Sequence, residues 1–127
     1  MGLSVAEDQI ISIGNILCDT SKPLTERFRA LFTLKNIGGQ RSIDVIGEAL
    51  VKDESALLKH ECAYCLGQMG DPHANTILID VLSNTNEHPM VRHEAGEALG
   101  AIGHEEAIEP LKVFHYQMLN SDSIFSI

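Results

Sequence analysis

Two His-Glu dipeptides are the residues of this sequence best suited to carry chemistry. His60-Glu61 and His93-Glu94 lie 33 residues apart in the chain. Two imidazoles and a carboxylate form a ligand set that suits non-haem Fe(II) and leaves open positions for oxygen. Neighbouring packed helices lie roughly 8–10 Å apart, so side chains at equivalent positions on two such helices can converge on one ion. The pattern therefore indicates a candidate metal site, provided that both dipeptides lie on stacked helices.

The same dipeptides are also consistent with a surface role. Copying of one ancestral repeat produces identical pairs at equivalent positions, and a single pair on a solvated helix carries no functional signal. The first repeat has Phe28 and Arg29 at the equivalent positions, so the fold does not require the pair. Neither dipeptide extends to His-Glu-x-x-His, and a zincin protease is therefore not supported.

The chain contains an internal repeat of 32 to 33 residues. Three segments end on Gly38, Gly70 and Gly103, and each has a basic residue, a small residue three later, leucine seven later and an apolar residue ten later. Each segment follows another apolar stretch, at residues 10–17, 43–51 and 77–82. A unit of two short helices that recurs at this period is typical of an α-solenoid.

We predict an all-α fold, an α-solenoid of HEAT-like helical hairpins with about three and a half repeats. The sequence motifs of ankyrin and tetratricopeptide repeats do not occur. The predicted domain covers residues 1–112, with repeats at about 7–38, 41–70 and 73–103 and a partial repeat from 104. Residues 113–127 are interpreted as a divergent, irregular tail, because no second helix for the fourth repeat follows.

The predicted helices carry recognisable boundary residues. Ser55 is expected to cap the start of the helix that holds His60, and Asp71, followed by Pro72, is expected to cap another start. The closing glycine of each repeat is expected to end its helix in the left-handed conformation. These signals agree with two helices per repeat.

Glycines occur on the helix face opposite the predicted core. In repeat two the apolar stripe expected to face the core consists of Leu58, Cys62, Cys65, Leu66 and Met69. His60, Tyr64 and Gly67 fall on the opposite side, and Gly100 is the equivalent of Gly67 in repeat three. An interior glycine costs a helix about 0.8–1.0 kcal/mol relative to alanine. Either a ligand that approaches the backbone or tight contact between helices in the stack accounts for that cost.

The remaining cysteines and histidines are interpreted as structural or solvated. The Cys62-x-x-Cys65 spacing resembles a redox or zinc motif, but repeat three has Ala95 and Ala98 at the equivalent positions. The pair is therefore interpreted as part of the core. Four further histidines have no repeated partner and are expected to be solvated: His73, His88, His104 and His115.

Composition excludes several classes of partner. The 127 residues include 9 basic and 18 acidic side chains, a net charge of −9. This balance argues against nucleic acid and against an anionic membrane surface, and it suits a cationic partner. No apolar run approaches the roughly 18 residues that a membrane helix needs. Three cysteines without a disulfide framework indicate a reduced, cytoplasmic protein.

Residues 24 to about 111 resemble deoxyhypusine hydroxylase. The resemblance rests on Arg27-Phe-Arg-Ala-Leu-Phe-Thr-Leu, Leu57-Leu-Lys-His-Glu-Cys-Ala-Tyr-Cys-Leu-Gly-Gln-Met and Pro89-Met-Val-Arg-His-Glu-Ala-Gly-Glu-Ala-Leu-Gly-Ala-Ile-Gly. It implies an O₂-dependent di-iron monooxygenase that hydroxylates deoxyhypusine in a eukaryotic translation elongation factor. In that family four His-Glu pairs, two in each half, hold two irons.

Carried onto this chain, the resemblance implies that His60, His93 and Glu94 are iron ligands. It implies that Glu61 either binds iron or faces the cationic amine of the substrate. The family is about twice as long, so we expect the chain to be one half of the enzyme, completed by a second copy or by a separate second half. The alternatives are a non-catalytic HEAT-repeat module that binds a protein and an inactive iron-binding fragment.

Overall fold

The computed structural model describes residues 5–120, and these residues form seven α-helices, two 3₁₀ turns and no strand. The first two hairpins are α1 (Val5–Leu17) with α2 (Leu24–Ile37) and α3 (Gly39–Lys52) with α4 (Ala56–Met69). The third is η1 (Pro72–Ala74) and α5 (Asn75–Ser83) with α6 (Pro89–Ile102), followed by η2 (Glu105–Ala107) and α7 (Ile108–Leu119). The predicted all-α hairpin stack is confirmed.

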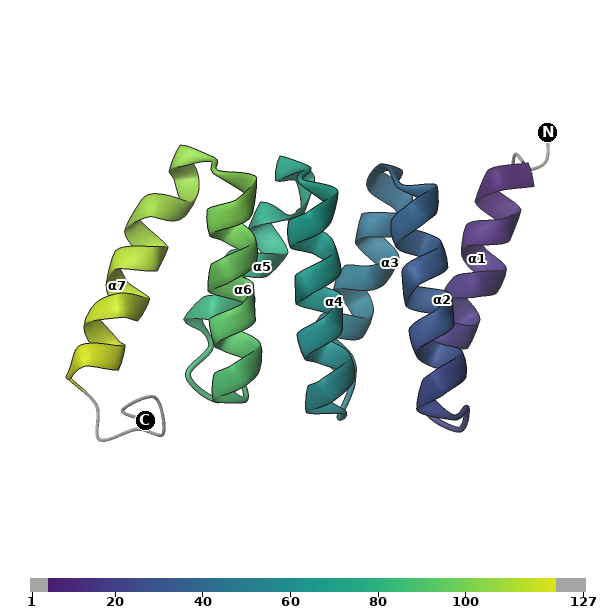
Figure 1. The fold of residues 1–127 in the computed structure, drawn as a ribbon, viewed down its shortest axis with the longest axis horizontal. Coiled ribbons are helices and arrows are strands. Elements are labelled where there is room, and N and C mark those ends of the chain that lie inside the picture. Colours follow the sequence, from purple (N-terminus) through teal and green to yellow (C-terminus); the bar gives the residue numbers. More distant parts are fainter. Residues whose placement is uncertain (1–4, 121–127) are drawn as a thin grey trace.

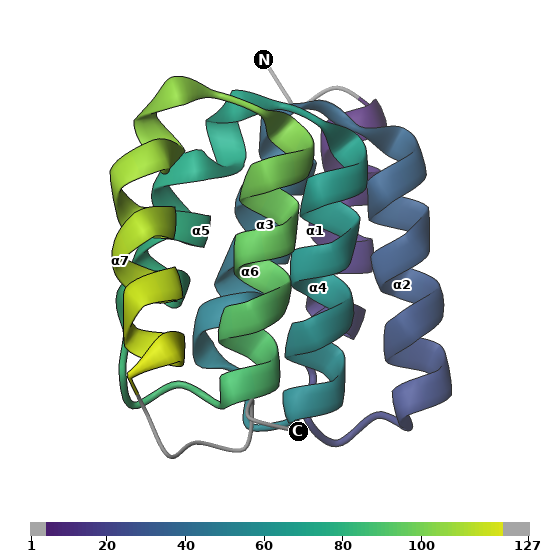
Figure 2. The same cartoon turned by 60° about the vertical axis from the view of Figure 1, so that its left-hand side comes forward.

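The helices form two layers. The second helices of the hairpins, α2, α4 and α6, lie side by side in one row (Figure 1). The first helices, α1, α3 and α5, form the row behind, and α7 continues that row beyond α5 (Figures 1 and 2). Among the described residues, α7 is the one first helix that is not followed by a second helix of its own hairpin. The structure therefore contains three hairpins and the first half of a fourth.

The core between the two layers is aliphatic. Leu34, Leu66 and Leu99 each lie four residues before the closing glycine of a repeat, and none is more than 1% exposed. The stripe expected to face the core in repeat two is also found there, since Leu58, Cys62 and the other predicted members pack in the same cluster. Equivalent apolar positions of successive repeats thus build one continuous core.

Most of the predicted helix caps are present in the structure. The Ser55 hydroxyl accepts a hydrogen bond of 3.2 Å from the Leu58 backbone N–H at the start of α4. Asp71 accepts one of 2.9 Å from the His73 N–H, although the element that it caps is the turn η1. Gly70 and Gly103 end their helices in the left-handed conformation as predicted.

Gly38 differs from the other two closing glycines. Its φ is +73°, but its ψ is −172°, which lies outside the left-handed helical region. The reason is that α3 begins at the next residue, so the chain reverses over Gly38 and Gly39 without an intervening loop. A positive φ was correctly predicted for the position, and the left-handed helical conformation was wrong.

The predicted start of an irregular tail at residue 113 is not a structural boundary. Residues 113–119 continue α7, because Leu111, Phe114 and Met118 keep the spacing of three and four residues that places apolar side chains on one helix face. Phe114 is buried, and Leu111 and Met118 pack against the core. The rest of the predicted tail, residues 121–127, lies outside the described residues.

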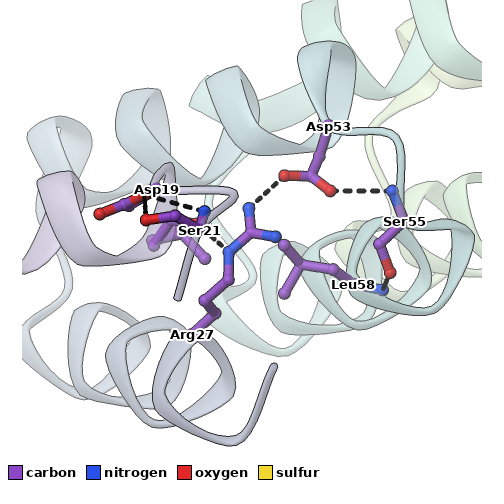
Figure 3. A network of polar contacts seen from close by, with 7 residues as sticks. Asp19, Ser21, Arg27, Asp53, Ser55 and Leu58 are labelled. Atoms are coloured by element: carbon purple, nitrogen blue, oxygen red, sulfur yellow. Dashed lines mark hydrogen bonds and ion pairs between the residues drawn. The ribbon is translucent and has the colours of Figure 1, made fainter. Parts of the chain in front are cut away.

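Buried basic side chains join successive repeats. Arg27 donates through Nε to the Leu17 carbonyl over 2.9 Å and forms an ion pair with Asp53 of the following hairpin. Asp53 in turn accepts the Ser55 backbone N–H over 2.8 Å, so one carboxylate connects α2 to the start of α4 (Figure 3). At the equivalent position in α6, Arg92 donates to the Leu82 carbonyl, also over 2.9 Å.

None of the helices in residues 5–120 combines the length and the apolar character that a bilayer crossing requires.

Candidate metal centre

The candidate site lies where α4 and α6 pack side by side. Gly67 of α4 is buried against Ala98 of α6, and a Cβ atom on residue 67 would lie 2.8 Å from the Ala98 Cα. The missing side chain therefore allows the two backbones to approach closely. Of the two explanations for this glycine, a ligand near the backbone or tight contact between helices, the structure supports the second. The two helices lie side by side (Figure 1), and a side chain of one His-Glu dipeptide reaches a side chain of the other across this contact.

His60 lies between two carboxylates. Its Nε2 atom is 3.3 Å from Oε2 of Glu94 on the neighbouring helix, and its Nδ1 atom is 3.6 Å from Oε1 of Glu61 on its own helix. The Glu94 side chain is the most enclosed of the three, at 15% exposure against 33% for His60 and 30% for Glu61. Three of the four predicted site residues therefore lie together across the α4–α6 contact.

His93 is oriented differently from its equivalent, His60. Its Nε2 atom lies 3.4 Å from Oε1 of Glu97, four residues later on the same helix. Residues four apart lie on one face of a helix, so Glu97 attracts this imidazole along α6. Within residues 5–120, no three His, Cys, Asp or Glu side chains are grouped so that they could hold a metal ion.

The pair formed by His60 and Glu94 nevertheless fits a metal ligand set. First-row ions bind imidazole nitrogen and carboxylate oxygen at about 2.0–2.2 Å. Two neighbouring ligands at about right angles are therefore about 3 Å apart, close to the 3.3 Å between His60 Nε2 and Glu94 Oε2. Imidazole and carboxylate are also donors suited to Fe(II). The spacing and chemistry of this pair are thus compatible with two ligands of one metal ion.

A groove of about 370 Å³, with Glu94 in its lining, runs between α4 and α6. Its lining residues are Tyr64, Gly67, Gln68, His93, Glu94, Glu97, Ala98 and Ala101. The Gln68 side chain donates a hydrogen bond of 2.7 Å to the Tyr64 hydroxyl and accepts one from Lys35 of α2. The sequence analysis did not predict that Gln68 would link Tyr64 to Lys35. Its position four residues after Tyr64 could have indicated the contact with Tyr64.

The two buried cysteines are core residues, as predicted. Cys62 and Cys65 are both 0% exposed and carry free thiols. Burial raises the pKa of the Cys65 thiol to about 11 and raises that of Cys62 further. Both side chains therefore stay protonated at neutral pH and act as small apolar groups.

The four histidines outside the dipeptides are exposed, as predicted, and three of them also make local contacts. His88 accepts the Met90 backbone N–H over 3.1 Å and caps the start of α6. His104 caps η2 in the same way, through the Glu106 N–H. His73 lies 2.7 Å from Asp44 of α3, and His115 lines a second groove between α6 and α7. The position just before Pro89 or before a helix start was the signal for the two caps.

Deoxyhypusine hydroxylases are among the proteins most similar to this chain. Those of Drosophila pseudoobscura and Danio rerio are each 58% identical, over 110 and 108 residues, and the human protein is 56% identical over 110 residues. These matches cover 85–87% of this chain but only 35–36% of the relatives. The chain therefore spans about a third of the length of these relatives, and the resemblance read from its motifs is confirmed.

A solved structure and a repeat family agree with this similarity. The structure of human deoxyhypusine hydroxylase in complex with glycerol matches with a TM-score of 0.80 at 44% identity, over 91% of this chain and 46% of that one. Residues 15–87 and 43–115 match the family of HEAT repeats, and together these ranges include both His-Glu dipeptides. The chain therefore belongs to the HEAT-repeat family.

Proposed function

We propose that this chain carries one half of the metal site of a deoxyhypusine hydroxylase, an enzyme that uses O₂ to hydroxylate deoxyhypusine in a translation factor and so forms hypusine. The observation that carries the proposal is the pair of His60 and Glu94, which come from equivalent positions of two repeats and lie 3.3 Å apart. The identity of 54–58% to deoxyhypusine hydroxylases of animals supports it. A translation factor as substrate favours action in the cytoplasm.

Each residue of the two dipeptides has a proposed role. His60, His93 and Glu94 would hold iron, and the bound iron would supply the activation of O₂. Glu61 carries a partly exposed carboxylate on the Nδ1 side of His60. From there it would either join the ligands or bind the cationic amine of the deoxyhypusine side chain. The net charge of −9 favours the approach of such a cationic substrate.

The residues of one chain are too few for a two-iron centre. Two imidazoles and two carboxylates supply four ligand groups, about the number that one ion binds with positions left open for oxygen. We propose that further ligands come from a second copy of the chain or from a separate second half. In a twofold-symmetric pair, the same face of each copy meets its counterpart, which brings four His-Glu pairs together.

Native mass spectrometry of the full chain after anaerobic addition of Fe(II) tests this proposal, because it reports assembly and metal count together. We expect iron-loaded species, with a dimer that carries two irons if a second copy completes the site. His60→Ala should lower the iron occupancy at least tenfold. The matched control is His73→Ala, since His73 pairs with Asp44 away from the α4–α6 contact. Equal iron occupancy in the wild type and in His60→Ala would overturn the metal role.

Hydroxylation is tested separately, with the assembled protein, iron, O₂, a reductant and a deoxyhypusine-bearing translation factor. Oxygen-dependent conversion that is lost in His60→Ala and kept in His73→Ala supports the enzyme. The competing function is a HEAT-repeat module that binds a protein without catalysis, and it is favoured by the open groove between α6 and α7. For that module, His60→Ala should change neither metal content nor partner binding.

A further inference from the structure

We infer that the buried ion pair of Lys59 and Glu87 positions the candidate metal ligands, because it ties the start of α6 to the first turn of α4. This role rests on the proposed metal function of His60 and Glu94. Neither Lys59 nor Glu87 would touch the ion. The pair would act through the two helices, by fixing how far the two ligands lie from each other.

The two charged groups of this pair are almost fully enclosed. The Nζ atom of Lys59 lies 2.5 Å from Oε2 of Glu87, and each side chain is 11% exposed. By contrast, the pair of Lys52 and Glu48 lies on the surface, where an ion pair constrains little. Removing one member of a buried pair leaves the other charge buried without a partner. Lys59 and Glu87 therefore hold each other in place.

Glu87 connects this pair to the first turn of α6. Its Oε1 atom accepts the backbone N–H of His88 over 2.8 Å. The His88 ring, which caps α6, in turn accepts the backbone N–H of Met90 over 3.1 Å. One carboxylate thus binds both the ammonium group from α4 and the capping residue of α6. The position of the cap therefore depends on the ion pair.

Both ends of this connection lie close to the candidate ligands. Lys59 immediately precedes His60, and Met90 lies four residues before Glu94, about one helical turn. A shift of the start of α6 along α4 would move Glu94 with it, because a helix turn is rigid. Ligand groups must be held within about 0.5 Å of their productive positions. The 3.3 Å between His60 Nε2 and Glu94 Oε2 is therefore sensitive to such a shift.

The internal repeat offers a comparison within the same chain. Arg27 occupies the position of Lys59 in the first repeat, and it forms an ion pair with Asp53 of the following hairpin. That pair joins α2 to the start of α4, whereas the pair of Lys59 and Glu87 joins α4 to the start of α6. Two buried pairs of the same kind thus differ in whether they connect the helices that carry the two His-Glu dipeptides.

Anaerobic Fe(II) titration of the full chain, measured by native mass spectrometry, tests the positioning role. Lys59→Met and Glu87→Gln should each lower the Fe(II) affinity at least about fivefold. The double variant should lose little more than either single variant, because the two residues act as one unit. Every variant is titrated at a temperature at which circular dichroism shows that it is folded. Glu87→Gln is the milder change, since the amide oxygen can still accept the His88 N–H.

Arg27→Met is the matched control. It removes a buried basic side chain at the same repeat position, but between helices that do not both carry a dipeptide. Its Fe(II) affinity should stay within about twofold of the wild type, even though the fold loses stability. A loss in Arg27→Met equal to that in Lys59→Met would overturn the positioning role, because general destabilisation would then account for both.

Hydrogen exchange of the iron-free chain gives a second measurement that needs no metal. The Arg92 backbone N–H donates to the His88 carbonyl over 3.0 Å in the first turn of α6. Its exchange rate, relative to that of the Leu66 N–H in α4, should rise at least about tenfold in both pair variants and stay unchanged in the Arg27 control. An unchanged ratio in the pair variants would overturn the connection between the pair and α6.

The two measurements separate this inference from the proposed function. A wild-type chain that binds no Fe(II) would overturn the proposed metal site and, with it, the positioning of its ligands. Fe(II) binding by the wild type that is lost in His60→Ala but equal in Lys59→Met would leave the metal site standing and overturn the positioning role alone.

Discussion

Gly67 of α4 and Ala98 of α6 are in such close contact that a Cβ on residue 67 would lie 2.8 Å from the Ala98 Cα and 2.9 Å from its Cβ. This contact lies on the same pair of helices as His60 and Glu94, whose nearest side-chain atoms are 3.3 Å apart. A larger residue at position 67 would separate the two helices. The glycine therefore determines whether the two His-Glu dipeptides can act on one ligand.

The first prediction compares alanine at the two equivalent glycines. Gly67→Ala should destabilise the chain by about 1–3 kcal/mol, since the clash with a neighbouring backbone outweighs the gain in helix propensity. Gly100→Ala should stabilise it by up to about 1 kcal/mol, because the helix gains propensity and no clash arises. Urea unfolding at neutral pH measures both. Changes of the same sign in the two variants would contradict the close contact at Gly67.

Much of this arrangement could be predicted from the sequence. The repeat placed His60 and His93 on neighbouring helices, and the apolar stripe identified the buried face, because both follow from local periodicity. The different surroundings of Gly67 and Gly100 could not be predicted, since they depend on what packs next in the stack. The spacing of four residues placed Glu97 on the same helix face as His93, but it did not determine whether the imidazole would contact Glu97 or a group on a neighbouring helix.

The end of the chain shows a second limit of sequence reasoning. The motif match fades after Leu111, which suggested an irregular tail, yet the helix continues to Leu119. Apolar spacing determines whether a segment is helical, and it persists through Phe114 and Met118 after the similarity in residue identity is lost. Motif similarity and helical periodicity are different signals, and the second was the better guide to structure here.

The second prediction concerns the buried arginines. Arg27→Ala should cost about 3–5 kcal/mol, because it leaves the carboxylate of Asp53, 5% exposed, buried without its partner. Arg92→Ala is the matched control. Besides the Leu82 carbonyl, Arg92 contacts the neutral amide of Gln117 and lies 5.0 Å from the centroid of the Phe114 ring, so its removal leaves no buried charge and should cost about 1–3 kcal/mol. Urea unfolding compares them, and an equal loss in both variants would contradict the role of Asp53.

The third prediction follows from the pKa of Asp53. Burial acts to raise it, but the hydrogen bonds from Arg27 and Ser55 and the charge of Arg27 outweigh burial and hold the pKa below its usual value. A lowered pKa in the folded state stabilises the fold above the unfolded pKa of about 3.9, and this contribution is lost as the pH falls through the folded value. The wild type should therefore lose part of its stability below about pH 4.

Asp53→Asn isolates that contribution. The variant should be less stable than the wild type at pH 7, and the difference in urea midpoint should shrink as the pH falls from 5 to 3. Glu48→Gln is a suitable control, because Glu48 pairs with Lys52 at 53% side-chain exposure and its charge contributes little. A difference between wild type and Asp53→Asn that stays constant across this pH range would argue against a stabilising ionised Asp53.

The last prediction separates the two glutamates of the candidate site. The Nε2 atom of His60 faces Glu94 and its Nδ1 atom faces Glu61, at 3.3 and 3.6 Å. If the imidazole binds iron through Nε2, Glu94 is placed to share the ion and Glu61 lies on the far side of the ring. Glu94→Gln should then lower the Fe(II) affinity at least about tenfold, whereas Glu61→Gln should change it less than about threefold and instead raise the KM for the protein substrate. Anaerobic Fe(II) titration followed by native mass spectrometry measures the affinity without any need for turnover. A loss of iron in Glu61→Gln equal to that in Glu94→Gln would assign both carboxylates to the metal and leave the substrate amine to another group.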